Sequence, residues 1–161
     1  VCSTDDPSSP IVNLLLNEQL QRLDLFSIGR LDKYTTGLII LTNDGVLAHS
    51  LLSPTKHVYK KYQFETKAPM SAEYIEVFEK GVVLEDGTVC RPAKLEQVDE
   101  THGYITICEG KFHQIKRMFL SVGNGIAELK RISIGNVMLD NALNYAEYRS
   151  LTEDEIDSLK H

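Results

Sequence analysis

Apolar and polar positions alternate along the chain with two different periods, and each period predicts its own kind of element. Residues 112–122 carry apolar side chains at every third or fourth position, at Ile115, Met118, Phe119 and Val122. This spacing predicts an amphipathic helix that ends at Gly123. Residues 58–67 alternate with a period of two, which predicts a strand with Tyr62 and Phe64 on one face.

Capping residues, glycines and prolines divide the rest of the chain. We expect helices over residues 11–20, 43–52 and 71–80, the last two capped by Asn43 or Asp44 and by Ser71, and a final helix begun by a Thr152–Glu155 capping box. We expect strands over residues 37–42, 82–84, 88–98 and 104–108, and one or two more within 127–139. This irregular alternation predicts an α+β fold with a mixed, largely antiparallel sheet and flanking helices. We take residues 1–161 as one domain, with room for two subdomains around one cleft.

Composition excludes several classes of protein. The 161 residues are 42% hydrophobic and 25% charged, which is typical of a globular domain and excludes a disordered or low-complexity chain. The three cysteines, Cys2, Cys90 and Cys108, form no C-x-x-C pair, so neither a disulfide framework nor a zinc site is expected, and a reducing compartment fits best. The longest apolar runs are too short to span a membrane, and no signal peptide is visible.

The net charge of −6 argues against a nucleic-acid partner, but the charge is unevenly distributed. Residues 27–64 sum to +3 and residues 110–131 sum to +4 inside an otherwise acidic chain. If the fold brings these two basic stretches together, they form one positive surface that can bind phosphates. Charge alone favours the simpler interpretation of two solvated surface stretches.

The same two stretches hold the most distinctive sequences. Residues 29–45 read G-R-L-D-K-Y-T-T-G-L-I-I-L-T-N-D-G and place Asp32 beside Arg30 and Lys33, ahead of a buried strand. Taken alone, such an aspartate is usually a capping residue of a turn. Residues 109–119 read E-G-K-F-H-Q-I-K-R-M-F and put Lys116 at the border of the apolar helical stripe, where a lysine usually extends toward solvent.

These stretches resemble the RsuA-type ribosomal RNA pseudouridine synthases. The family pattern G-R-L-D-x-x-T-x-G-L-x-x-L-T-N-D-G matches residues 29–45 throughout. A second pattern, K-x-Y, matches residues 60–62, and a third, E-G-x-x-H-Q-[IV]-[KR]-R-M, matches residues 109–118. All three occur in the family's order, and the resemblance runs from about Val1 to about Leu159. It implies the pseudouridine synthase catalytic fold.

The resemblance also implies a chemistry. The family reaction breaks the bond from the ribose C1′ to uracil N1 and forms a bond to uracil C5, with no cofactor and no metal. The carboxylate that acts at the sugar is Asp32 by motif match, either as a nucleophile or as a base. Lys116 matches the basic residue that the family places against this aspartate, which would keep the carboxylate ionised.

Tyr62 matches the family tyrosine that packs on the target base and is implicated in removing the C5 proton, although Tyr34 and Tyr59 are rivals nearby. The uridine must be extruded from the RNA to reach such a site, and Arg30 resembles the arginine that fills the space it leaves.

The basic residues of both stretches are candidates for phosphate contacts that position RNA, although either lysine of the 60–61 pair could point away from it: Lys33, Lys60, Lys61, Lys111, Arg117, Lys130 and Arg131. We interpret His113 and Gln114 as residues that shape the loop and form hydrogen bonds near the pocket, because no second histidine or cysteine has metal-ligand spacing.

The resemblance makes ribosomal RNA or a pre-ribosomal particle the expected partner of a cytoplasmic, monomeric enzyme. The amino-acid sequence of the third motif most resembles the subgroup that acts on small-subunit (16S) rRNA. Large-subunit rRNA, a non-catalytic rRNA-binding assembly module and a hydrolase that releases uracil are the alternatives. RsuA-type enzymes usually carry an S4-like RNA-binding module ahead of the catalytic domain. This chain starts at Val1 without that module, and we expect it to be the catalytic part of a longer protein.

Overall fold

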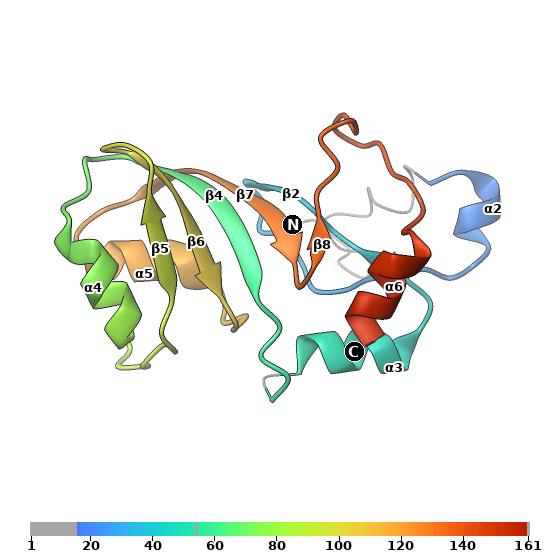
Figure 1. Cartoon of the computed structure of the whole chain (residues 1–161), viewed down its shortest axis with the longest axis horizontal. Coiled ribbons are helices and arrows are strands. Elements are labelled where there is room, and N and C mark those ends of the chain that lie inside the picture. Colours follow the sequence, from blue (N-terminus) through green and yellow to red (C-terminus); the bar gives the residue numbers. More distant parts are fainter. Residues whose placement is uncertain (1–15, 54, 161) are drawn as a thin grey trace.

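A computed structural model describes residues 16–53 and 55–160 and is built on a mixed sheet (Figure 1). The sheet runs in the order β2 (Thr35–Gly37), β7 (Ile126–Ile134), β4 (Lys60–Thr66), β6 (His102–Ile107) and β5 (Lys94–Gln97), and β8 (Val137–Met138) pairs with β7. Only the β2–β7 pair of this sheet is parallel. Two short strands, β1 (Phe26–Ser27) and β3 (Leu41–Thr42), pair separately. The expected α+β fold with a mixed, largely antiparallel sheet is confirmed.

α5 (Gln114–Ser121) covers one face of the sheet, and α4 (Glu73–Lys80) lies beside β5 and shares the same apolar core (Figure 1). The stripe that predicted α5 buries Ile115, Met118 and Phe119 against this face. Phe119 lies 4.9 Å from Phe64 of β4 and 5.0 Å from Phe78 of α4, measured between ring centroids. Because side chains alternate along a strand, the neighbouring β4 residues Lys61 and Gln63 project from the opposite face of the sheet.

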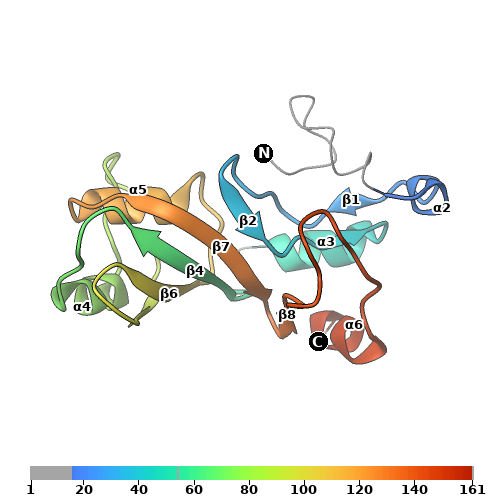
Figure 2. The same cartoon turned by 90° about the horizontal axis from the view of Figure 1, so that it is seen from above.

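A second apolar cluster lies at the other end of the long strands, where α3 (Gly45–Leu52) and α6 (Glu153–Lys160) pack together (Figure 2). Ile134 and Val137 of β7 and β8 join it from the sheet. Each helix has a cap that the sequence predicts. Asp44 accepts a hydrogen bond from the Leu47 amide, and Thr152 and Glu155 bond reciprocally across the first turn of α6.

The expected strand over residues 37–42 is wrong, because the chain changes sheets within it. β2 ends at Gly37, whose φ of +108° ends the parallel pairing with β7, and β3 begins only at Leu41 in the smaller sheet. An ideal Cβ on Gly37 would lie 2.1 Å from the Arg131 carbonyl oxygen, so only glycine allows this close approach of two backbones. A continuous apolar run cannot reveal such a crossing.

Three other element predictions need correction. Within the region expected as strands over residues 82–84 and 88–98, the structure has a single Val83–Val89 bridge and then β5. Ser71 does not cap α4, which begins after Ala72 with no side-chain cap. Of the helix expected over residues 11–20, residues 11–15 lie outside the described part, and the described remainder forms the short α2 (Glu18–Gln21).

The strand over residues 58–67 and the helix over 112–122 are confirmed as β4 and α5, and residues 127–139 form two strands, β7 and β8. Among the described residues, none of the helices combines the length and the apolar character needed to cross a membrane.

Candidate active site

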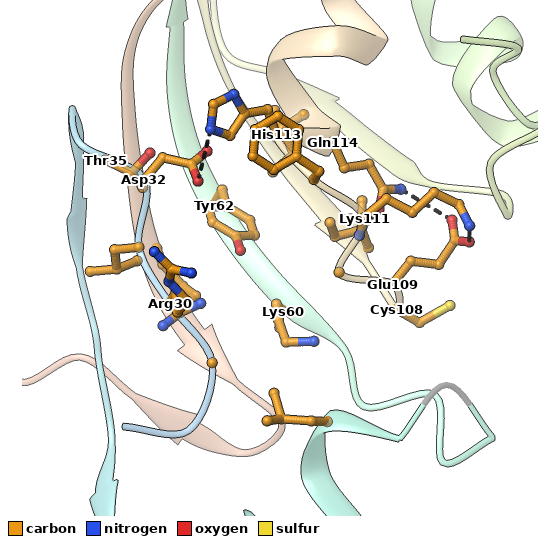
Figure 3. Close-up of a pocket in the computed structure, with 18 of the residues that line it drawn as sticks. Arg30, Asp32, Thr35, Lys60, Tyr62, Cys108, Glu109, Lys111, His113 and Gln114 are labelled. Carbon is orange, nitrogen blue, oxygen red and sulfur yellow. Dashed lines mark hydrogen bonds and ion pairs between the residues drawn. The ribbon is translucent and has the colours of Figure 1, made fainter. Parts of the chain in front are cut away.

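A cavity of about 580 Å³ opens between the two apolar clusters, and residues far apart in the sequence meet in it (Figure 3). One wall is the loop over residues 29–32 and the end of α3, and the other is the loop over residues 108–113 with the start of α5. The sheet supplies the floor through residues that alternate on one face, namely Lys60 and Tyr62 of β4, Ile107 of β6, and Leu129 and Arg131 of β7. This volume is typical of a small-molecule or single-nucleotide site.

All three distinctive motifs contribute to the lining. Asp32 comes from the first motif, Tyr62 from the second and Lys116 from the third. Arg30, Lys60, Lys111 and Arg131 line the same cavity, so cations from both basic stretches meet here. The chain therefore has a negative net charge and yet contains a cavity whose charged lining side chains are mainly positive.

Asp32 lies in a turn closed by the hydrogen bond that the Thr35 amide donates to the Asp32 carbonyl, at 2.9 Å. Its carboxylate faces His113, whose Nε2 is 3.6 Å from Asp32 Oδ1 (Figure 3). The expected ion pair between Asp32 and Lys116 is not formed: within the described residues the only basic side chain within 4.0 Å of the Asp32 carboxylate is His113. His113 has a left-handed backbone (φ +47°) immediately before α5, and sequence spacing cannot predict the side-chain direction that this sets.

Tyr62 is the tyrosine in the cavity, and the rivals Tyr34 and Tyr59 do not line it. Tyr34 is 77% exposed and Tyr59 is 58% exposed. The two adjacent lysines Lys60 and Lys61 lie on opposite faces of the sheet. Lys60 shares the cavity face with Tyr62, whereas Lys61 projects from the other face of the sheet, 3.2 Å from Glu96 and over the ring of Tyr104.

Burial and the positive charge of Arg131 lower the pKa of Lys60 below its ordinary value. Both causes act in the same direction, because loss of water and a neighbouring cation each disfavour the charged lysine. The cavity floor is therefore prepared for a negatively charged or strongly polar ligand group.

Gln114 organises the loop that carries the third motif, as the sequence predicts for a loop-shaping residue. It is 4% exposed, and its Oε1 accepts a hydrogen bond from the Lys111 amide at 3.0 Å while its Nε2 donates to Glu109 at 3.1 Å. Burial alone would raise the pKa of Glu109, but hydrogen bonds from the Arg91 amide, Lys111 and Gln114 outweigh it and lower that pKa. The roles of Glu109 and Arg91 in this loop were not predicted from the sequence. A usable signal is that a buried glutamine usually needs polar partners nearby.

We expect Gln114→Leu to destabilise the protein by about 1–3 kcal/mol, because it leaves the part-buried Lys111 amide without its acceptor and removes one of the hydrogen bonds to the Glu109 carboxylate. Thermal unfolding measures this loss, and single-turnover activity should fall with it, since the same loop lines the cavity. Gln63→Leu is the matched control, because Gln63 is exposed on the opposite face of the sheet. Equal melting temperatures of the two variants would contradict the role of Gln114.

Four basic residues expected to touch RNA do not line the cavity: Lys33, Lys61, Arg117 and Lys130. Arg117 instead binds Glu85 at 2.8 Å and Asp86 at 3.1 Å, and donates to the Phe112 carbonyl oxygen. It therefore holds the third-motif loop against the hairpin turn of residues 85–87. Lys33 lies over the exposed ring of Tyr34. The side chain of Lys130 projects from the face of β7 opposite to Arg131, away from the cavity.

The structure adds an aromatic feature at the cavity wall. The Phe112 ring stacks on the His113 ring with centroids 3.9 Å apart and an interplanar angle of 15°, and Phe112 is 76% exposed. Over the described part of the chain, no three His, Cys, Asp or Glu side chains cluster in a way that could hold a metal ion.

Comparisons with known proteins agree in one family. The profile of the family described as RNA pseudouridylate synthase matches residues 1–121. An "Uncharacterized RNA pseudouridine synthase YtzG" of Bacillus subtilis (strain 168) is 48% identical over 159 residues, which are 96% of this chain and 66% of that protein. The "Ribosomal small subunit pseudouridine synthase A" of Escherichia coli (strain K12) is 44% identical over 160 residues, which are 99% of this chain and 69% of that protein.

A solved structure, "Crystal structure of pseudouridylate synthase", superposes with a TM-score of 0.92 at 38% identity and covers 98% of this chain and 69% of that one. The chain thus spans about two thirds of the length of the relatives it matches.

Proposed function

The chain belongs to the RNA pseudouridylate synthase family, and from this premise we propose that it isomerises one uridine of small-subunit (16S) ribosomal RNA to pseudouridine. The observation that carries the proposal is the meeting of Asp32, Tyr62 and Lys116 in one cavity, because each comes from a different motif. Chance could place one motif residue in a cavity, but a common site for all three is what a shared chemistry requires.

In this proposal Asp32 acts at the ribose C1′ of the extruded uridine, either by attacking the sugar or by removing a proton from it. Its carboxylate is half-buried, with 31% of the side chain exposed, and faces the cavity where the sugar would lie. His113 is the side chain next to it, with Nε2 3.6 Å from Asp32 Oδ1. Lys116 lines the same cavity and adds positive charge to its wall.

Tyr62 presents a flat ring on the cavity floor, suited to stack on the uracil, with a hydroxyl at one edge for proton transfer at C5. Arg30 is exposed at the cavity wall, where it can enter the RNA stack as the uridine leaves it. Lys60 and Lys111, which also line the cavity, would approach the adjoining backbone phosphates.

The choice of small-subunit RNA rests on the Escherichia coli relative named for the ribosomal small subunit, which is 44% identical over 99% of this chain. Large-subunit rRNA remains the alternative target, because the relatives extend beyond this chain and the additional part can contribute to the choice of RNA. We propose that the reaction takes place in the cytoplasm and that the protein acts as a monomer.

The test is to incubate the purified chain with unmodified 16S and 23S transcripts and to map pseudouridine by carbodiimide treatment and primer extension. The proposal expects one new stop in the 16S transcript, at a uridine, and no release of free uracil. A stop only in the 23S transcript would overturn the assigned target. Release of uracil would identify a hydrolase, and RNA binding with no conversion at any protein concentration would identify a non-catalytic binding module.

A further inference from the structure

We propose that Arg131 donates a hydrogen bond to a carbonyl oxygen of the uracil ring and stabilises the negative charge that the ring carries while it is detached from the sugar. This inference rests on the proposed function and deepens it, because it assigns a transition-state role to a residue outside the three motifs. It starts from the unusual environment of this one guanidinium group.

Arg131 is 2% exposed, yet it lines the cavity. Its Nε donates to the Leu38 carbonyl oxygen at 2.8 Å, which fixes one edge of the group. Its Nη2 is buried and finds no hydrogen-bond acceptor among the described residues. No carboxylate of residues 16–53 and 55–160 lies within 4.0 Å to neutralise it. A buried, unneutralised guanidinium is costly to the fold, so its presence at a cavity points to a ligand that completes it.

The neighbours of Arg131 indicate what that ligand is. Arg131 is the cross-strand partner of Tyr62 in the β4–β7 pair, so both side chains rise from the same face of the sheet. A base that stacks on Tyr62 therefore has its edge beside the guanidinium. The Thr35 hydroxyl, also buried in the lining and without a hydrogen-bond partner in the described part, offers a second polar contact.

Burial distinguishes a base carbonyl from a backbone phosphate. A phosphodiester continues into the chain on both sides and is strongly hydrated, so it fits the exposed wall where Arg30 stands better than the guanidinium of Arg131, a residue with 2% exposure. The carbonyl oxygens of a flat, terminal uracil can reach such a floor. Burial and the positive charge of Arg131 lower the pKa of the half-buried Lys60, so a second basic side chain lies near the guanidinium.

The chemistry creates a charge for Arg131 to stabilise. When the C1′–N1 bond breaks, its electron pair stays on the uracil, and the resulting anion is delocalised over N1, O2 and O4. The electron deficiency at the sugar is met by a bond to the Asp32 carboxylate or by loss of a sugar proton to it. The C5–C1′ bond then forms, which releases Asp32 or returns its proton to the sugar. Finally the C5 proton leaves and N1 gains one, so the product is an isomer of the substrate.

A single fixed donor can serve both halves of this reaction. To present C5 in place of N1, the ring must turn by half a rotation about the axis through N3 and C6. That rotation also exchanges O2 and O4. An Arg131 Nη2 that bonds one carbonyl before cleavage therefore bonds the other afterwards, with no movement of the protein.

The experiment compares Arg131→Gln and Arg131→Lys with Lys130→Gln, a matched control that removes the adjacent positive charge on the opposite face of β7. Single-turnover rates at saturating 16S transcript and RNA dissociation constants over a range of salt are measured for each folded variant. We expect Arg131→Gln to lose about 100-fold in rate, the scale for one donor at a developing oxyanion. Its dissociation constant should stay within about threefold of the wild type, with the salt slope unchanged.

A phosphate contact would give the opposite pattern. Weaker binding with a salt slope reduced by about 0.7–0.9, at an unchanged saturated rate, would overturn the proposal. A purely structural role would lower the melting temperature while each folded variant kept the wild-type rate, and this would overturn it too. If the wild type forms no pseudouridine, the proposed function itself has failed. If the wild type and the Arg131 variants are all fully active, only the inference about Arg131 is refuted.

A substrate modification keeps the test open even if both variants fail to fold. Replacing O2 or O4 of the target uridine by sulfur weakens it as a hydrogen-bond acceptor, so the wild-type rate should fall with at least one of the two RNAs. In a folded Arg131→Lys protein the same replacement should cost less, because the contact is already impaired. Unchanged wild-type rates with both thio-RNAs would overturn the proposal.

Discussion

Asp32→Asn is expected to reduce pseudouridine formation by at least about 10³-fold, the scale on which removal of a nucleophile or base acts. An asparagine side chain has the same shape, but it carries no negative charge and neither attacks a sugar carbon nor removes a proton from it. Primer extension on carbodiimide-treated 16S transcript measures the loss. The variant should fold normally, because the turn at this site is held by the Asp32 backbone carbonyl and not by the carboxylate.

RNA binding by Asp32→Asn should persist or strengthen slightly, since the substitution removes a negative charge from a positively lined cavity. Asp44→Asn is the matched control within the same motif. Asp44 caps α3, and asparagine caps a helix as well as aspartate does, so activity and stability should both stay near the wild type. Full activity of Asp32→Asn would contradict the assignment of Asp32, whatever the control shows.

The elements that the sequence predicts well are those whose signal is local. α5, β4 and the capping box of α6 depend on a period or on contacts between residues three or four apart, and all three are present. The run over residues 37–42 fails because its structure depends on a distant partner. The chain leaves one sheet at Gly37, where the backbone of Arg131 approaches, and that partner lies far along the sequence.

The candidate site shows the same division. The motif match selects Asp32, Tyr62 and Lys116, and all three line one cavity. It does not predict that His113, in a left-handed conformation, is the side chain that contacts Asp32. Nor can charge counting separate Lys60 from Lys61 or recognise that Arg117 is held by Glu85 and Asp86, because both outcomes depend on sheet faces and on residues in another segment.

Gly37→Ala is expected to destabilise the protein by about 3 kcal/mol or more, the range of strain at a special backbone conformation combined with a steric clash. Gly37 has φ +108°, and an added Cβ would lie 2.1 Å from the carbonyl oxygen and 2.6 Å from the amide nitrogen of Arg131. Both clashes are with backbone, so no side-chain rotation relieves them. The parallel β2–β7 pair must separate, and the melting temperature should fall by about 10 °C.

The same substitution should damage the cavity beyond its effect on stability, because the backbone that must move carries Arg131 and, two residues earlier, Leu129, and both line the floor. Activity measured well below the melting temperature should therefore fall in Gly37→Ala while circular dichroism still reports a folded protein. Gly45→Ala is the control: Gly45 opens α3 with nothing within 4 Å of an added Cβ, and alanine favours a helix by about 1 kcal/mol over glycine. If Gly37→Ala has the same melting temperature as Gly45→Ala and keeps its activity, the β2–β7 contact does not hold the cavity floor in place.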